Sequence, residues 1–596
     1  MKPLRPLLIA TLATLVAAAG PARAADDEAR VIVRFKPQAD SVRARALALR
    51  ATRAEAREIA QTRATALGLR AGRRLEAGLN LDERTQVVVA SGLSSAELAR
   101  QLAADGEVEF VAVDQRRKHM KLPNDPLFGG AAVNPESTVG GLQTRSIDQW
   151  YLKAPAGAVA SSINAPAAWE LTTGAASVIV AVLDTGIRPD HPDLAGQIVP
   201  GYDMIGFGSP GATATAIAND GDGPDADPSD PGDWVSRADI DAKRLGADCD
   251  SSDIGNSSWH GTRVAGLIAA ASNNGLGMAG VGWGLKIMPI RVLGKCGGYD
   301  SDIIAGMKWA AGIAVPGLPA NPNRAKVLNL SLGGSGACGS SGVGALYRDA
   351  ITQLDAAGAT VVVAAGNSEG QAIGMPANCP GVITVAALRH VGTKVGFSSL
   401  GPEATIAAPG GNCINVGANQ ACLYPMLSTT NTGTTAPVAA DDAYTGGAAS
   451  VGTSFSAPIV SGIVGLMASV RSALTAAEAA QLLKSTARPF PTTGGGSAAD
   501  GNPPQCRAPS STAVQDECYC TTSTCGAGMV DAAAAVAAAR ALNEGGTIGS
   551  GTTSTASSSG DSGGGGGAMS AAWLAGLLAA ALALKGLKGL KGSGRR

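Results

Sequence analysis

Five short apolar runs, separated by helical patterns, constrain the fold of this chain more than any other feature. Each run is too short for a helix and too continuously apolar for a strand with one face in water. Such runs are typical of strands buried on both faces of a parallel sheet. Their alternation with helices predicts an α/β fold with helices on both faces of the sheet. The runs are VIVAVLD, KIMPIRVL, VLNLSL, TVVVAA and VITVAAL, and helices are expected at 260–271, 303–311, 343–357 and 454–470.

A single large domain over residues 122–543 is long enough to hold this sheet. In open parallel sheets the ligand crevice lies beyond the carboxyl ends of the strands. Polar residues that end a run are therefore candidate site residues. Asp184 ends the first run, and Asn367 follows the fourth run after Gly366.

The segment GTSFSAP, at 452–458, places Ser454 at the start of an apolar helix. Gly452 and Thr453 let the backbone turn tightly before the serine, and a helix N-terminus favours negative charge that develops beside the hydroxyl. The same pattern also fits a simple helix cap. Ser454 therefore needs a base elsewhere in the chain before it can be interpreted as a nucleophile.

Only four histidines are available as that base. His260, in HGTRVAGLIAA, begins a helix of small residues that permits close packing, whereas the other three lack comparable surroundings. Asp184, followed by Thr185 and Gly186, supplies an acid that can fix the histidine tautomer. The order Asp, His, Ser is one of the known arrangements of this triad.

The motifs DTG, HGTxVAG and GTSxSAP, in this order, resemble the subtilisin-like serine proteases, or subtilases, over residues 150–539. The resemblance implies that Asp184 orients His260, that His260 takes the proton of Ser454, and that Ser454 attacks a peptide carbonyl to form an acyl-enzyme. It also implies that the Asn367 side chain and the Ser454 amide hold the oxyanion. Phe455 departs from the methionine that many members carry beside the nucleophile.

The same resemblance implies that substrate adds as an extended strand between two backbone edges. One edge is Ser331, Leu332, Gly333 and Gly334, and the other lies near Gly297 and Gly298. Gly374 occupies the family position at the base of the primary pocket, and no acid accompanies it in AIGMP. We therefore expect a preference for large apolar or aromatic residues before the scissile bond.

Calcium is the expected cofactor, because two stretches offer hard oxygen ligands in flexible loops. The first resembles the tight calcium site of the family and comprises the side chains of Asp193 and Asn274 with the carbonyls of Leu276 and Met278. The second is an acidic stretch, for which a solvated loop is an equally good interpretation. Its carboxylates are Asp220, Asp222, Asp225 and Asp227.

Residues 1–24 resemble a secretory signal peptide, with a short apolar core and the sequence ARA before the expected cleavage site. A membrane anchor is the alternative. Ten cysteines agree with an oxidising compartment. By order along the chain we expect the pairs Cys249–Cys296, Cys338–Cys379 and Cys413–Cys422, with two local bridges among Cys506, Cys518, Cys520 and Cys525; zinc binding by the last four is the less favoured alternative.

Residues 25–121 form a separate, arginine-rich unit with strands expected at VIVRFK, TQVVVA and VEFVAV and helices at 41–69 and 94–105. This alternation resembles the inhibitory prodomain of subtilases, a small ferredoxin-like unit that would be removed by a cut between Arg117 and Leu122. The arginines are dispersed rather than clustered, so nucleic acid is not an expected partner. The overall net charge of −1 says little about other partners.

After a Gly/Ser-rich linker at 544–567, residues 568–596 form an apolar run with a basic end. This tail resembles the GlyGly-CTERM sorting signal of Gram-negative bacteria, in which a membrane-embedded protease removes the anchor. A permanent anchor with the protease outside the cytoplasm is the alternative. Either way, the chain is expected to be exported and at least transiently held at the cell surface.

These features together predict a secreted serine endopeptidase of broad specificity that acts on proteins and peptides. Two other hypotheses remain open at this point. The chain could be a processing protease for a few partners, or a surface-displayed binding protein on an inactive protease fold.

Overall fold

The computed structural model describes residues 28–48, 50–114, 122–129, 148–157, 159–208, 211–412, 424–446, 450–494, 502–510 and 513–544. The chain divides into two compact units, residues 1–120 and 121–596, and each is described by itself. The expected signal peptide, most of the expected processing segment, the Cys413–Cys422 pair and the C-terminal tail lie outside the described residues.

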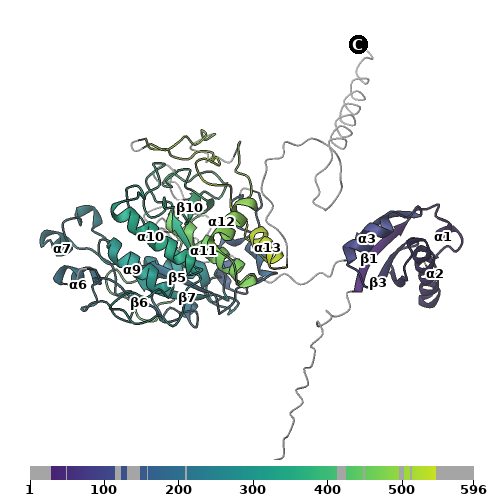
Figure 1. The fold of residues 1–596 in the computed structure, drawn as a ribbon, viewed down its shortest axis with the longest axis horizontal. Helices are drawn as coiled ribbons and strands as arrows, with labels where there is room; N and C mark the ends of the chain where they lie inside the picture. The colour runs from purple at the N-terminus through teal and green to yellow at the C-terminus, as the bar shows by residue number, and fades with distance from the viewer. Residues whose placement is uncertain are drawn as a thin grey trace, which may run out of the picture. The chain divides into compact units, whose positions relative to one another are not determined.

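The N-terminal unit is an antiparallel sheet in the order β2-β3-β1-β4 with helices packed against one face (Figure 1). Apolar residues that alternate along β1 meet Leu67 of α2 and Leu98 and Leu102 of α3 in one small core. The elements are β1 (Glu28–Phe35), α1 (Asp40–Arg43), α2 (Arg53–Ala71), β2 (Glu76–Asn80), β3 (Thr85–Ser91), α3 (Ser95–Ala103) and β4 (Val108–Val113).

The single helix expected over residues 41–69 is wrong, because the segment forms two helices, α1 and α2, with a break between them. Thr52 has an extended backbone and forms a capping box with Glu55, which starts a new helix at that point. The carbonyls of Ser41 and Arg45, left free by the break, accept hydrogen bonds from the buried Arg63. Strand β2 was also not expected from the sequence.

In the large unit, a seven-stranded sheet has the order β11-β10-β9-β8-β5-β7-β6, and every neighbouring pair is parallel. This confirms the expected fold class. The five predicted strands are β5 (Ile179–Asp184), β7 (Lys286–Arg291), β8 (Val327–Leu330), β9 (Thr360–Ala364) and β10 (Ile383–Leu388). The sequence did not indicate the edge strands β6 (Tyr202–Asp203) and β11 (Ile406–Pro409), which are short, nor the pair β12 (Ser428–Thr429) and β13 (Tyr444–Thr445).

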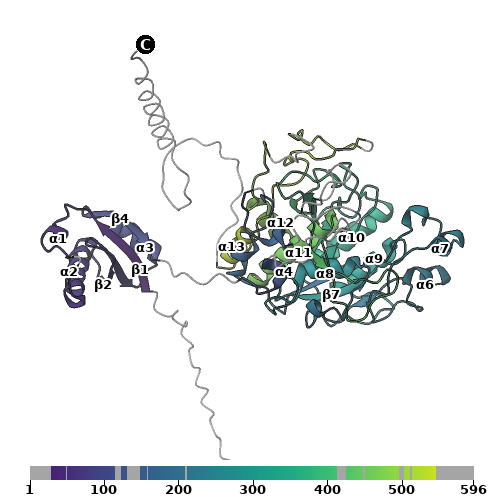
Figure 2. The ribbon, with the colours of Figure 1, turned by 180° about the vertical axis from the view of Figure 1, so that it is seen from behind.

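Helices cover both faces of this sheet (Figures 1 and 2). One core joins the sheet to α8 and α11, and a second core joins its other face to α9 and α10. Helix α11 is long and apolar enough to cross a membrane, but most of it is buried in the protein core. The four predicted helices are α8 (His260–Ala269), α9 (Asp300–Ala310), α10 (Gly342–Ala356) and α11 (Thr453–Val470). The remaining helices are α4 (Pro126–Gly129), α5 (Ala165–Trp169), α6 (Ala212–Ala218), α7 (Arg237–Asp241), α12 (Ala476–Ser485) and α13 (Ala532–Asn543).

Candidate active site

Three residues far apart in the sequence reach one region beyond the carboxyl ends of the strands. Asp184 is the last residue of β5. Ser331 directly follows β8, the strand that pairs with β5. His260 is the first residue of α8, and Ser454 lies in the first turn of α11. Asp184 thus ends a strand, as the sequence predicted, whereas His260 and Ser454 lie at helix starts.

The closest contact in this region joins His260 to Asp184. The ring Nδ1 lies 2.8 and 3.0 Å from the two carboxylate oxygens of Asp184. Asp184 is fully buried, whereas the imidazole is 24% exposed, so its other nitrogen remains accessible. Burial lowers the pKa of His260, but the charge and hydrogen bond of Asp184 raise it by more, and the result lies above the usual value.

Close packing between β5 and α8 explains the glycine in the HGT motif. A Cβ atom on Gly261 would lie 2.0 Å from the carbonyl oxygen of Gly186 and 3.2 Å from Cβ of Asp184. The Gly261 amide donates to the Thr185 hydroxyl over 3.1 Å. That hydroxyl in turn donates to Asp230 over 2.7 Å. A hydrogen bond thus links Thr185 and Gly261, the residues that follow Asp184 and His260.

Asp230 was not found by sequence reasoning, because it lies within an acidic loop that carries many similar residues. Its carboxylate is buried and accepts from Thr185 and from the Gly232 amide. Burial raises the pKa of Asp230 to about 7, and the nearby Asp233 carboxylate adds to the increase.

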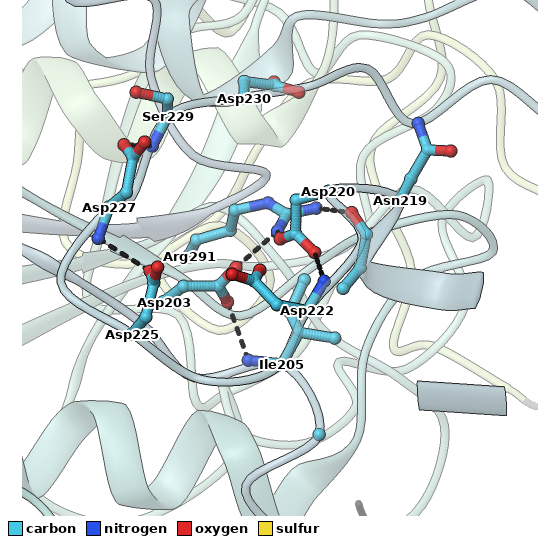
Figure 3. A network of polar contacts seen from close by, with 12 residues as sticks. Asp203, Ile205, Asn219, Asp220, Asp222, Asp225, Asp227, Ser229, Asp230 and Arg291 are labelled. Carbon is cyan, nitrogen blue, oxygen red and sulfur yellow. Dashed lines mark hydrogen bonds and ion pairs between the residues drawn. The ribbon is translucent and has the colours of Figure 1, made fainter. Parts of the chain in front are cut away.

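Arg291, at the end of β7, contacts a carboxylate of the same acidic loop (Figure 3) and also bonds to the turn after Asp184. Its Nε donates to the Thr185 carbonyl over 3.2 Å. Its Nη1 contacts Asp220 at 2.5 Å and also pairs with the buried Asp203. Burial raises the pKa of Asp203 to about 7, although Arg291 opposes the rise.

The acidic loop does not gather its carboxylates around one point, as the calcium interpretation of this stretch required. Asp220 is held by Arg291, while Asp225 and Asp227 accept from backbone amides two residues further on. Figure 3 shows these side chains spread around Arg291. Within the described part of the chain, no three of these carboxylates lie close enough together to share an ion.

Ser454 is partly exposed, and its Oγ donates to the Ser331 carbonyl over 3.3 Å rather than to His260. A rotation about χ1 is therefore needed to direct the hydroxyl to the imidazole. Catalytic hydrogen bonds of this kind are often long or misaligned until substrate binds.

A buried polar chain fixes the backbone on which Ser454 sits. The Ser331 hydroxyl donates to the Ser454 carbonyl over 2.8 Å and accepts from Asn329 over 2.9 Å. Asn329 accepts in turn from Ser461 of α11 over 2.9 Å. Ser454 is therefore positioned by β8 as well as by its own helix.

Asn367 presents its amide nitrogen because its amide oxygen is already occupied. Oδ1 accepts from the backbone and the hydroxyl of Thr453, over 3.0 and 2.9 Å. The Thr453 hydroxyl accepts from the Gly366 amide over 3.2 Å. Thr453 thus orients Asn367, a role that the sequence could not separate from that of a simple turn residue.

A cavity of about 900 Å³ opens beside Ser454 and Asn367. Its walls are the segments 331–337 and 371–378, which are joined by a hydrogen bond from the Gly334 amide to the Met375 carbonyl over 2.8 Å. A Cβ atom on Gly374 would lie 1.9 Å from the Gly334 carbonyl oxygen, so this position requires glycine. All five predicted substrate-binding residues line the cavity: Ser331, Leu332, Gly333, Gly334 and Gly374. Gly297 and Gly298 are not among its lining residues.

One acid, Glu403, also lines this cavity. The sequence around Gly374 did not indicate this acid, because Glu403 comes from a separate turn between β10 and β11. Its side chain is exposed, so the expectation of a pocket without buried charge still stands as a prediction.

Around the predicted calcium site, Asp193 is buried and accepts three hydrogen bonds. The donors are the Asn274 amide over 3.3 Å, the Met278 backbone over 2.8 Å and the Tyr444 hydroxyl over 3.0 Å. The oxygen of Asn274 accepts from the Leu276 amide. Asn274 therefore turns its nitrogen, not its oxygen, toward Asp193.

Asp125, which the sequence did not single out, lies against the same loop. Its buried carboxylate accepts from the amides of Asn273 and Asn274. Burial raises the pKa of both Asp125 and Asp193, and among the described residues no lysine or arginine pairs with either one. Two buried carboxylates without a basic partner are a donor set that fits a divalent cation.

Four of the expected disulfides are present in the described residues: Cys249–Cys296, Cys338–Cys379, Cys506–Cys518 and Cys520–Cys525. Cys338–Cys379 joins the two walls of the cavity, as expected. The described cysteines are all paired, which disfavours the zinc alternative.

Comparisons with known proteins agree with this geometry. A family model described as "Subtilase family" matches residues 175–517. An "Extracellular protease" of Xanthomonas campestris pv. campestris is 37% identical over 512 residues, which cover 86% of this chain and 73% of that protein. An "Extracellular basic protease" of Dichelobacter nodosus is 36% identical over 398 residues, 65% of this chain and 56% of that protein. A solved protease structure from Pseudoalteromonas arctica is 39% identical in sequence and has a TM-score of 0.53. The match covers 70% of this chain and 99% of the solved chain.

Proposed function

The chain belongs to the subtilase family of serine peptidases, and from this premise we propose that it is a secreted endopeptidase that uses Asp184, His260 and Ser454 as its catalytic triad. The observation that supports the proposal most is the bond between His260 Nδ1 and the buried Asp184 carboxylate. The ring of His260 also lies 5.7 Å, between ring centres, from Phe455, the residue that follows Ser454. No other described histidine has a carboxylate on its ring.

In the proposed reaction, Asp184 holds the proton on Nδ1, so that Nε2 of His260 is free to accept one. Ser454 Oγ attacks the peptide carbonyl carbon while its proton passes to Nε2. His260 then gives this proton to the leaving amine, and the C–N bond breaks to leave an acyl-enzyme. Water attacks the ester with His260 again as base, and Ser454 is restored.

Asn367 and the Ser454 amide are proposed to stabilise the oxyanion. Replacing Asn367 with leucine should lower kcat by about 10²- to 10³-fold with little change in KM, because the lost donor acts mainly on the charge that develops in the transition state. Steady-state kinetics on a tetrapeptide anilide measure this split. Thr453→Val, which removes only the hydroxyl that orients Asn367, should give a smaller loss of kcat. If Asn367→Leu instead raised KM by a similar factor and left kcat unchanged, the oxyanion role of Asn367 would be contradicted.

We propose that substrate binds as an extended strand along Ser331 to Gly334, which gives main-chain contacts that depend little on sequence. Apolar side chains among the residues that line the cavity, namely Leu332, Ile373 and Met375, support a preference for large apolar residues before the scissile bond. Digestion of a peptide library tests this breadth. Cleavage at very few sites would favour a dedicated processing protease. Cleavage that is the same in Ser454→Ala would not come from this chain, and would favour a binding protein without activity of its own.

Export is proposed from the sequence of residues 1–24 and from the printed names of the relatives, two of which are extracellular proteases. Residues 25–121 are proposed to act as an inhibitory prodomain, cut between Arg117 and Leu122. Residues 568–596 are proposed to act as a temporary sorting anchor. Mass spectrometry of the released enzyme tests both cuts, since an intact tail on soluble protein would contradict tail processing.

Calcium is proposed to bind at the loop 273–278 with Asp193 as its main ligand, assisted by the carbonyls of Leu276 and Met278. Asn274 would join them only after its amide turns its oxygen toward Asp193. Bound calcium would offset the buried charge of Asp193 and the nearby Asp125. Because a ligand that binds only the folded state stabilises it, excess EDTA should lower Tm by roughly 5 °C or more.

The calcium experiment has two matched variants. Asp193→Asn should lower Tm and make it insensitive to EDTA, while Asp222→Asn in the exposed acidic loop should leave the EDTA effect intact. Differential scanning calorimetry measures all three proteins with and without chelator. An unchanged Tm of the wild-type protein in EDTA would remove the calcium proposal.

A further inference from the structure

We propose that Glu403 makes the primary pocket accept lysine and arginine before the scissile bond, in addition to large apolar residues. The inference rests on the proposed endopeptidase function and names a part of its substrate range. The carboxylate of Glu403 lies in a cavity whose other lining residues carry no charge.

Glu403 reaches the pocket through the packing of its own turn. Leu400 pairs with the wall segment at Gln371 and Ile373 through two backbone hydrogen bonds, which places the turn at 401–403 directly beside that wall. The carboxylate lies close to Gly401: a Cβ atom built there would be 2.2 Å from Oε2 of Glu403 and 3.3 Å from Cδ1 of Ile373. Gly401 therefore leaves the room that the carboxylate occupies beside Ile373.

The charge of Glu403 has no protein partner that would cancel it. Among the described residues, no hydrogen bond or ion pair involves its exposed side chain. It is also the only charged residue among those that line the cavity. A cationic group that enters this space therefore meets a carboxylate and no competing positive charge.

Lysine and arginine fit such a pocket because each combines an apolar stem with a charged end. The stem can pack against Ile373 and the backbone of the two walls, and the charged end can reach Glu403. Because the carboxylate is exposed to water, the gain is modest. An exposed ion pair of this kind corresponds to about a fivefold effect at most.

The test compares kcat/KM for four anilide substrates that differ only in the residue before the scissile bond, namely lysine, arginine, phenylalanine and glutamine. Glu403→Gln should lower the lysine-to-phenylalanine ratio about three- to fivefold and leave the phenylalanine value nearly unchanged. Glu403→Lys should lower the ratio further. The lysine-to-phenylalanine ratio of the wild-type enzyme should fall in 1 M salt, because salt screens exposed charges.

Glu369→Gln is the matched control, because Glu369 is an exposed carboxylate near Asn367 that does not line the cavity. It should leave the ratio unchanged. A ratio that moves less than twofold in Glu403→Gln, or that moves equally in the control, would overturn the inference. Absence of cleavage of all four substrates by the processed wild-type protein would instead refute the proposed function, so the two failures are distinguishable.

Discussion

Replacing Ser454 with alanine is expected to lower kcat for peptide hydrolysis by about a million-fold, because no acyl-enzyme can form without the hydroxyl. Substrate binding should be nearly unchanged, since the cavity walls and the backbone edge at Ser331 are intact. Assays on casein and on a tetrapeptide anilide measure the loss. A small residual rate over water is expected, because the oxyanion donors remain.

Residues 25–121 are proposed to inhibit the enzyme, so the N-terminal unit is removed before this comparison. A trace of tagged wild-type enzyme can cut the variant precursor and then be withdrawn on its tag. Ser456→Ala, two residues further along α11, is the matched control, because it also removes one serine hydroxyl. The Ser456 hydroxyl contacts the carbonyls of Ala408 and Pro409 rather than the cavity. Hydrolysis by purified Ser454→Ala within tenfold of wild type would contradict the assignment.

Replacing Asp184 with asparagine should lower kcat by about 10⁴-fold near neutral pH. The amide can donate to Nδ1 of His260, which moves the ring proton to Nε2 and removes the base. The same change should alter the pH profile. In the proposed triad, activity requires neutral His260, so activity falls as the pH drops through the His260 pKa, which Asp184 holds above its usual value. Without that charge, the acid limb of kcat/KM should shift to lower pH.

A pH profile of kcat/KM from pH 5 to 10 measures both effects. Asp355→Asn, an exposed carboxylate on α10, is the matched control and should leave rate and profile unchanged. An acid limb that stays at the wild-type position in Asp184→Asn would show that another group controls the ionisation.

The central part of the fold was predictable because its signals are local. A run such as VIVAVLD contains both the strand β5 and the residue that ends it, and HGT and GTS each lie at the start of one helix. The strand-end rule then places Asp184 and Asn367 at one edge of the sheet. For these residues, local sequence was sufficient to predict position.

Other features depend on contacts between distant segments, which one sequence does not reveal. Glu403 lies at the pocket because Leu400, three residues before it, forms backbone hydrogen bonds with Gln371 and Ile373, and nothing around Gly374 indicates this. Asp125 joins the loop at 273–278 across about 150 intervening positions. Arg291 appears in the sequence as an ordinary strand residue, yet it is buried and holds the acidic loop to the turn after Asp184.

The break between α1 and α2 has a different cause. Alanine and arginine favour helix on both sides of Thr52, so propensity alone predicts one continuous helix. The capping box of Thr52 with Glu55 and the bonds from Arg63 to the intervening carbonyls stabilise the break instead. Tertiary hydrogen bonds outweigh local propensity at this point.

The most direct test of the triad is to map the site of reaction with phenylmethanesulfonyl fluoride by peptide mass spectrometry. In the proposed site, Ser454 Oγ attacks the sulfur, the S–F bond breaks, fluoride leaves and His260 takes the proton. The expected result is a single sulfonyl adduct on Ser454 that forms in step with the loss of activity and forms far more slowly in His260→Ala. Loss of activity with Ser454 unmodified, or equal labelling in both proteins, would contradict the account.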